Sequence, residues 1–262
     1  MTYLDTAVSS WTLHKLLAAD ADGSQITLFD LPALLAQHGY KAAEICNFHI
    51  TSTDVPSLRL LRVALENAGV RLVNLLIDTG DISALALDVR AREITEVKNW
   101  IDIASAIGAD SVRIIAGRRP ANPTTLREAA DTMHDLALYA ADRDVAVCTE
   151  NWYGLLDTPE DVIELMRLTD GNIGLKLDFG NWPAPRKFDD LRLIAPYAST
   201  THSKPALTAD GKIDHEDFLR CLSAIEQGGF TGRHVLVYDG PDDVWAALDE
   251  LKSMLPMVAQ SR

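Results

Sequence analysis

Short hydrophobic stretches rich in β-branched residues alternate along the chain with longer segments in which hydrophobic positions recur at helical spacing. This alternation is typical of repeated strand–helix units whose strands form a parallel sheet. The pattern predicts eight strands, at residues 4–9, 42–47, 71–76, 111–116, 146–151, 174–178, 198–202 and 234–238. It predicts helices at residues 31–38, 56–68, 89–107, 124–142, 159–168, 215–227 and 243–254.

Glycines follow several of the predicted helices, at Gly39, Gly69, Gly108 and Gly228, where glycine commonly ends a helix. Eight strands with intervening helices in 262 residues match a (β/α)8 TIM barrel, which typically has roughly 250 residues. A doubly wound dinucleotide-binding fold would need a glycine-rich turn after its first strand, but that strand runs into SSWTLHKLL. We therefore predict an α/β protein with a single TIM barrel domain over residues 1–262.

The chain carries 38 acidic and 24 basic residues, a formal net charge of −14 that would repel a polyanion. Arg118 and Arg119 form its densest basic pair, so no nucleic-acid partner is expected. The three cysteines, Cys46, Cys148 and Cys221, lie in apolar stretches without CxxC spacing, which fits a reducing compartment. Without a basic and apolar leader or a run of about 18 apolar residues, we expect a soluble, cytoplasmic protein with no membrane partner.

Polar side chains end three consecutive predicted strands: Glu150, Asp178 and His202. Because side chains alternate between the two faces of a strand, these three residues can point inward at a common place. Two carboxylates and one imidazole suit a divalent cation such as Mn²⁺, Mg²⁺, Co²⁺ or Zn²⁺. Taken singly, each residue could instead make a loop contact, cap a turn or form a hydrogen bond in the core.

Two basic residues are predicted to lie near this site. Lys176 lies two residues before Asp178 and shares its face, so it could bind substrate, neutralise Glu150 and Asp178 without a metal, or form a structural ion pair. Arg113 alternates with Ser111, so it could point into the barrel toward an anionic group or form a salt bridge.

Tryptophans follow three predicted strands, at Trp11, Trp152 and Trp182. Their rings could bind substrate by stacking on a sugar or an aromatic glycoside, or they could simply pack. Asn151 and Asn181, each just past a predicted ligand, could orient the ligands through hydrogen bonds.

Several motifs together resemble one known superfamily. The segment 145–182 contains ENW, DTPEDVIELM and GLKLDFGNW and is followed by THSK, HGYKAAEI surrounds the second strand, and GGFTGRHVLVYDG contains the last. This ordered set resembles the xylose-isomerase-like sugar phosphate isomerase/epimerase superfamily over nearly the whole chain. The superfamily includes sugar isomerases, ketose epimerases, dehydratases, enzymes that cleave C-glycosides and apurinic endonucleases.

The resemblance also implies a set of site residues. The usual metal ligands of the superfamily are a Glu, an Asp, a His and a second Glu, and the first three fall on Glu150, Asp178 and His202. Glu44 matches an acidic residue that could hold a substrate hydroxyl or orient a neighbouring side chain. Lys204 matches a lysine that often follows the family histidine and would act as an electrophilic helper.

The fourth ligand position departs from the family pattern. The last strand usually ends in a glutamate, but here the corresponding residue is Val237, which has no lone pair to offer. Asp239 would lie on the same face, roughly 6.6 Å further along, and could serve only with a rearranged ligand shell. This departure weighs against an epimerase mechanism that needs two carboxylates.

Three functions follow as hypotheses. The first is an isomerase, epimerase or related lyase acting on a sugar, keto-sugar or polyol with a divalent metal, in which Glu150 is both ligand and base. The second is a barrel that has lost its metal and acts as a binding or regulatory subunit, to which Val237 and Lys176 point. The third, an apurinic endonuclease, conflicts with the net charge. The expected partner is a small sugar or polyol, and the chain could also form a homo-oligomer.

Overall fold

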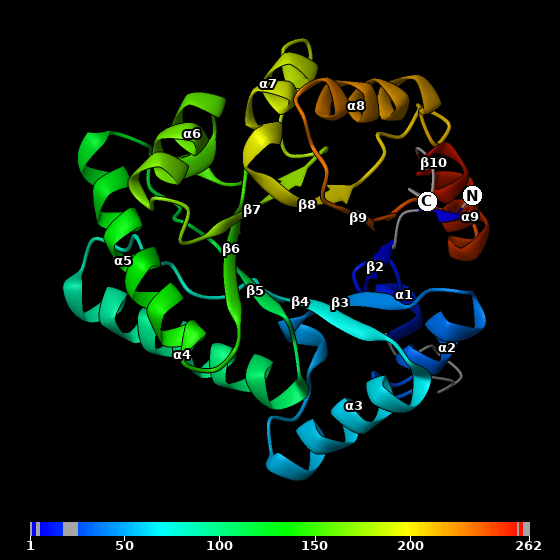
Figure 1. Cartoon of the computed structure of the whole chain (residues 1–262), viewed down its shortest axis with the longest axis horizontal. Coiled ribbons are helices and arrows are strands. Elements are labelled where there is room, and N and C mark those ends of the chain that lie inside the picture. Colours follow the sequence, from blue (N-terminus) through cyan, green and yellow to red (C-terminus); the bar gives the residue numbers. More distant parts are fainter. Residues whose placement is uncertain (1, 4–5, 18–25, 256, 259–262) are drawn as a thin grey trace.

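The structure is a computed structural model that describes residues 2–3, 6–17, 26–255 and 257–258. Parallel strands β2 to β9 pair in chain order and close into a barrel at the centre of the molecule (Figure 1). These strands are β2 Ala7–Ser9, β3 Ala42–Cys46, β4 Arg71–Ile77, β5 Ser111–Ile114, β6 Ala146–Glu150, β7 Gly174–Asp178, β8 Ala198–Ser203 and β9 Arg233–Leu236. The predicted (β/α)8 TIM barrel is therefore confirmed.

Helices surround the barrel and cover the outer face of its strands (Figure 1). They are α1 His14–Leu17, α2 Leu31–Gln37, α3 Val55–Ala68, α4 Leu87–Ile107, α5 Pro123–Ala141, α6 Pro159–Leu168, α7 Lys187–Ile194, α8 His215–Gln227 and α9 Val244–Met254. Short 3₁₀ helices lie at η1 Asn47–His49, η2 Gly154–Leu156 and η3 Ala195–Tyr197. Near the two ends of the chain, β1 Thr2–Tyr3 pairs antiparallel with β10 Met257–Val258.

Several elements differ from the sequence prediction, among them α1, β1 and β10, which were not predicted. Helix α7 was not among the predicted helices because its buried face includes Lys187 and Asp190, which interrupt the hydrophobic periodicity. The Nζ atom of Lys187 donates to Asp217 Oδ2 in α8 at 2.6 Å, so a partly buried ion pair replaces part of the apolar contact. The first predicted strand begins only at Ala7 in the described structure, and residues 4–5 lie outside the described residues.

Local sequence signals fix several helix ends. Asn122 caps α5: its side chain accepts hydrogen bonds from the backbone of Thr124 and Thr125, and Pro123 takes the first helical position. At the other ends of α3 and α4, Gly69 and Gly108 have φ angles of +63° and +77°, a left-handed conformation that glycine adopts without strain.

Alternation along the strands separates the barrel interior from the outer core. On β7, Leu175 and Leu177 belong to the large hydrophobic core formed with the helices. Lys176 and Asp178 alternate with them and therefore point into the barrel. The interior is thus polar toward the carboxyl ends of the strands, where the predicted site residues lie.

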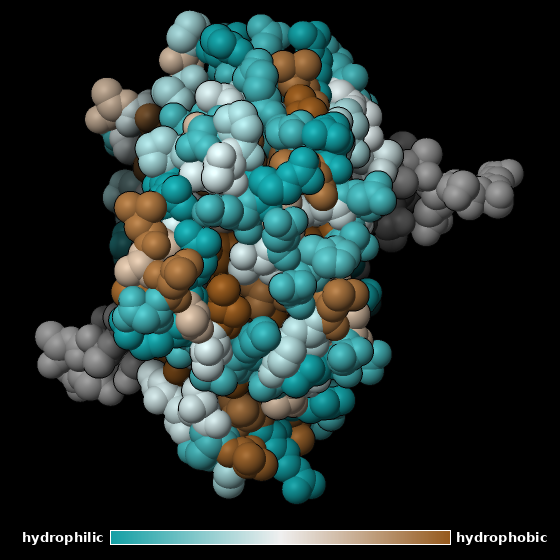
Figure 2. Space-filling view, turned by 90° about the vertical axis from the view of Figure 1, so that its left-hand side faces the viewer, coloured by the Kyte–Doolittle hydropathy of each residue, from teal (hydrophilic) through white to brown (hydrophobic). Residues whose placement is uncertain are grey.

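The outer surface on the side of α4 to α6 is mostly hydrophilic, with scattered hydrophobic side chains (Figure 2). In the part of the chain that the structure describes, no helix combines the length and the apolar character needed to cross a membrane.

Candidate active site

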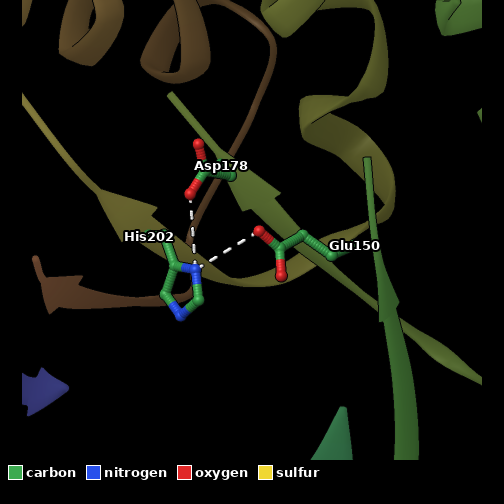
Figure 3. Close-up of side chains that lie close together, drawn as sticks. All are labelled: Glu150, Asp178 and His202. Carbon is green, nitrogen blue, oxygen red and sulfur yellow. Dashed lines mark ion pairs between the residues drawn. The ribbon is translucent and has the colours of Figure 1, made fainter. Parts of the chain in front are cut away.

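Glu150, Asp178 and His202 converge at the carboxyl ends of β6, β7 and β8. Figure 3 shows both carboxylates directed at the imidazole, and His202 Nδ1 lies 3.4 Å from Glu150 Oε1 and 3.4 Å from Asp178 Oδ2. One ligand atom from each of the three residues can be chosen so that all lie within 4.8 Å of one another. The structure thus brings together the three residues predicted as metal ligands.

Glu44 lies beneath this cluster and is fully buried. Its Oε2 atom lies 2.8 Å from His202 Nε2, and its Oε1 atom accepts a hydrogen bond from Lys176 Nζ. When Nε2 carries the proton, this contact leaves the Nδ1 lone pair of His202 directed at Glu150 and Asp178. Of the two predicted roles for Glu44, the structure supports the orientation of a neighbouring side chain, because its oxygens are engaged away from any substrate.

Lys176 differs from two of its predicted roles. Its ammonium is fully buried, pairs with Glu44 and donates to Thr200 Oγ1 at 2.9 Å. The prediction that it contacts substrate, or pairs directly with Glu150 or Asp178, is therefore wrong, and the structural ion pair is confirmed. The reason is that Glu44, on β3 across the barrel interior, supplies a carboxylate that no pattern within the β7 sequence reveals.

Arg113 is the cation that pairs with Glu150. Its Nε atom lies 3.0 Å from Glu150 Oε2, and its terminal nitrogens donate to Asp78 Oδ1 at 2.7 Å and to the Ile77 carbonyl at 3.2 Å. Arg113 is buried and forms ion pairs within the protein. Of its two predicted roles, the salt bridge is therefore confirmed. The guanidinium still lines the cavity described below, where a substrate group could approach it.

The charges around Glu150 favour its ionised form. Burial alone would raise the pKa of Glu150, but the charges of His202 and Arg113 outweigh burial and lower this pKa to about 2. Asn181 Nδ2 also donates to Glu150 Oε1 at 3.0 Å, the hydrogen bond predicted between Asn181 and a candidate metal ligand. Burial would lower the pKa of His202, yet the nearby carboxylates of Glu150 and Glu44 raise it to about 10.

These features fit a divalent cation. Glu150 Oε2 is buried and has no contact with hydrogen-bond geometry among the described residues; apart from its ion pair with Arg113 Nε it keeps a lone pair for a ligand. The carboxylates of Glu150 and Glu44 raise the pKa of His202, so the cluster favours a positive charge, which a divalent ion would supply in place of a proton. The group includes four carboxylates (Glu44, Asp78, Glu150 and Asp178) and the two cations Lys176 and Arg113. With neutral His202, two negative charges remain for a divalent ion to balance.

A cavity of about 230 Å³ opens above the cluster. Lys204 and Val237 line it together with Glu150, Asp178 and His202. Position 237 thus faces the site as expected, and the apolar side chain of Val237 lies where the family resemblance predicts a carboxylate. Asp239 does not join the ligand cluster, because its Oδ2 atom pairs with Lys204 Nζ at 2.7 Å near the mouth.

The three predicted tryptophans have different surroundings. Trp11 and Trp152 line the cavity, and their role in substrate binding stays a prediction. Trp182 is 5% exposed, belongs to the hydrophobic core and donates from Nε1 to the Leu156 carbonyl at 3.3 Å. It is therefore a packing residue, and its predicted role in substrate binding is not supported.

Asn151 links β6 to β7, since its side chain forms hydrogen bonds with both the backbone N–H and the carbonyl of Asp178.

The sequence patterns did not single out every residue that lines the cavity, and Asp78 and Phe48 are among those that they missed. Asp78 follows β4 and fixes Arg113, and Phe48 follows β3 and forms part of the apolar wall. Both lie just past a predicted strand, which is the signal that identified Glu150 and the tryptophans. That signal alone could have found them.

Comparison with known proteins gives the same assignment of fold. The family model described as "Xylose isomerase-like TIM barrel" matches residues 32–254, whereas no curated protein matches the chain. A D-allulose 3-epimerase from Methylomonas sp. superposes with a TM-score of 0.71 at 17% identity, over 97% of this chain and 99% of that one.

Two further solved structures are similar. A probable 3-DHS dehydratase from Bacillus anthracis has a TM-score of 0.71 at 14% identity and covers 97% of this chain and 98% of its own. A xylose isomerase-like TIM barrel protein from Mycobacterium smegmatis, solved in complex with magnesium, has a TM-score of 0.69 at 15% identity, over 97% of this chain and 96% of its own. At these identities the likeness shows the fold alone. Because the family model spans most of the sequence, this chain belongs to the family of xylose isomerase-like TIM barrel proteins.

Proposed function

We propose that this protein is an enzyme that moves a proton on a small sugar, keto-sugar or polyol with the help of a divalent metal ion. The convergence of Glu150, Asp178 and His202 at the base of a cavity is the observation that carries the proposal. Similar structures include an epimerase and a dehydratase, which is in keeping with this general chemistry. The structure bound to magnesium supports the choice of a divalent ion.

Glu150, Asp178 and His202 would hold the ion, of the Mn²⁺, Mg²⁺, Co²⁺ or Zn²⁺ type. When bound, such an ion polarises a carbonyl or hydroxyl oxygen and acidifies the adjacent C–H group. Glu150 is ionised at neutral pH and is proposed to accept that proton. Lys204, held at the mouth by Asp239, is proposed to donate to a substrate oxygen.

A second candidate function is a reaction that needs only one carboxylate base. The apolar side chain of Val237 favours this candidate. Epimerisation by two opposed carboxylates would need an acid where the cavity has an apolar side chain. In an elimination, Glu150 would take the proton, the C–H electron pair would form a C=C bond, and Lys204 would protonate the departing hydroxyl to give water. A dehydratase or related lyase therefore fits the residues of this cavity.

Calorimetric titration with Mn²⁺ tests the metal centre. Wild-type protein should bind one ion per chain, and Asp178→Asn should weaken binding more than about 100-fold because an anionic ligand is lost. Asp102→Asn is the matched control, since Asp102 pairs with Arg143 away from the cavity. No binding by wild type would contradict the proposed centre and favour the metal-free binding barrel. Equal binding by Asp178→Asn would show that the ion does not bind at the proposed centre.

Hydrogen exchange tests the proposed reaction. Mn²⁺-loaded protein should exchange the proton next to the carbonyl of a suitable ketose or keto-sugar with deuterium from D₂O, as followed by proton NMR. Glu150→Gln should abolish exchange, whereas Lys204→Met should slow it. If exchange persists in Glu150→Gln, Glu150 is not the base.

A further inference from the structure

Aromatic side chains form a wall across the barrel from the carboxylates. In a closed barrel of eight strands, β2 and β3 are each four places from β6 and β7 and therefore lie opposite them. Trp11 follows β2 and Phe48 follows β3, and both line the cavity that contains Glu150 and Asp178. A substrate held at the carboxylate side would present its far end to these two rings.

The two rings remain accessible at the mouth of the cavity. Trp11 is 40% exposed and Phe48 is 44% exposed, and their ring centroids lie 6.1 Å apart in an edge-to-face arrangement. Aromatic faces that line a cavity and stay open to solvent offer apolar contact area to a bound molecule. This area is continuous with the candidate active site, so the same substrate can reach both.

A hydrogen-bonded chain holds the rings in place. Ser10 Oγ accepts from the Cys46 backbone N–H at 2.9 Å and lies 2.8 Å from His49 Nδ1. His49 Nε2 in turn lies 2.9 Å from His14 Nδ1, and the His14 ring stacks on Trp11 at 5.2 Å. The chain ties the segments after β2 and β3 to one another. Side chains that are already fixed before binding lose little conformational entropy when a ligand binds.

We infer that Trp11 and Phe48 bind a flat apolar group carried by the substrate, so that the substrate is a glycoside or keto-glycoside with an aromatic aglycone rather than a free sugar. The cavity, at about 230 Å³, is small beside ligand pockets of roughly 300–1,000 Å³. It suits one sugar-sized unit over the carboxylates, and a larger substrate extends past the mouth along the two rings. The inference names the substrate class and rests on the proposed function.

The indole N–H signals of ¹⁵N-labelled protein test the aromatic site directly. Phenol serves as the probe, in buffer with EDTA so that no metal contributes. The Trp11 signal, identified by its loss in Trp11→Phe, should shift and saturate during the titration. The signal of Trp100, whose Nε1 donates to Glu96 on the outer helix α4, should stay in place. In Phe48→Ala the affinity of phenol at Trp11 should fall.

Matched glycosides test the substrate class. Phenyl and methyl glycosides of glucose, galactose and xylose differ only in the aglycone, and the phenyl member of at least one pair should bind about tenfold more tightly. Trp11→Ala should remove this preference, whereas Trp100→Phe should keep it. Equal affinity within every pair, no binding of any phenyl glycoside, or an unshifted Trp11 signal overturns the inference.

These experiments distinguish a failure of the aromatic site from a failure of the proposed metal-dependent function. A failure of the metal centre appears in the Mn²⁺ titration and leaves the phenol shifts intact. A failure of the aromatic site appears in the indole signals and leaves Mn²⁺ binding intact.

Discussion

Val237 decides how many carboxylates the site can offer. It is 4% exposed and faces the same cavity as the three candidate ligands. Val237→Glu should raise Mn²⁺ affinity at least about tenfold, because a fourth anionic ligand adds coordination and charge neutralisation. Calorimetric titration measures this change, with Val63→Glu on the outer helix α3 as the control for added charge.

Equal or weaker Mn²⁺ binding by Val237→Glu would show that a side chain at this position does not reach the ion. In buffer with EDTA the variant should be less stable than wild type, since it buries a carboxylate without a partner. Addition of Mn²⁺ should reverse that loss in a thermal unfolding experiment.

Glu44 supports the site through His202 and Lys176. Glu44→Gln should lower the free energy of unfolding by about 3–5 kcal/mol, because Lys176 would remain buried without an ionised partner. It should also weaken Mn²⁺ binding by about 10–100-fold, the usual effect of losing a group that orients a ligand. Urea unfolding and calorimetry measure the two effects.

The double variant Glu44→Gln/Lys176→Met separates the two roles of Glu44. It removes both charges of the pair, so it should recover part of the stability but none of the metal affinity. If the single and double variants are equally stable, the ion pair between Glu44 and Lys176 does not explain the loss.

At the scale of elements, caps and turns explain where helices begin and end. Asn122 forms a capping box with Thr125 at the start of α5. Asn122→Ala should cost about 1 kcal/mol of stability, because two backbone N–H groups lose their acceptor. Thr124→Ala is the matched control, since its backbone rather than its side chain takes part in the cap. A similar loss in both variants, measured by urea unfolding, would mean that the cap contributes nothing specific.

The strand ends matter more for the site than the helix ends. Glu150 and Asp178 are the last residues of β6 and β7, and the register pairs Asp178 with His202 on β8. Parallel pairing in this register brings residues from three separate parts of the chain to one level of the barrel. A residue one position earlier or later would point out toward the helices.

At the scale of the whole molecule, buried histidines make stability depend on pH. Burial lowers the pKa of His234 to about 4, whereas an unfolded histidine has a pKa of about 6.5. Between these two values the unfolded chain binds a proton that the folded chain does not. Stability should therefore fall as pH falls from 6.5 to 4, by up to about 3 kcal/mol from this residue.

The variant His234→Gln should flatten this dependence, as measured by urea unfolding at several pH values. His134→Gln, at an exposed histidine on α5, is the control for removing an imidazole. A pH profile of His234→Gln that coincides with wild type over this range would contradict the assignment.

The sequence by itself determined the barrel and most of its elements. The spacing of hydrophobic residues and the glycines that follow helices are local properties, so β7, α6 and α8 were predicted at their observed bounds. Glu150, Asp178 and His202 were also predictable, because a strand end in this fold has a known place in space. Helix α7 was missed because Lys187, which forms a partly buried ion pair with Asp217, interrupts the hydrophobic periodicity.

Only the tertiary structure decided which charged residues form ion pairs with one another. Lys176 could equally have paired with Asp178 on its own strand, and Arg113 could have faced a substrate. The closed barrel instead brings Glu44 of β3 to Lys176, and it places Asp78 and Glu150 at Arg113. Trp182 follows a strand as Trp11 and Trp152 do, yet it packs into the core. Ion pairs and packing depend on distances between residues far apart in sequence, and no local pattern encodes those distances.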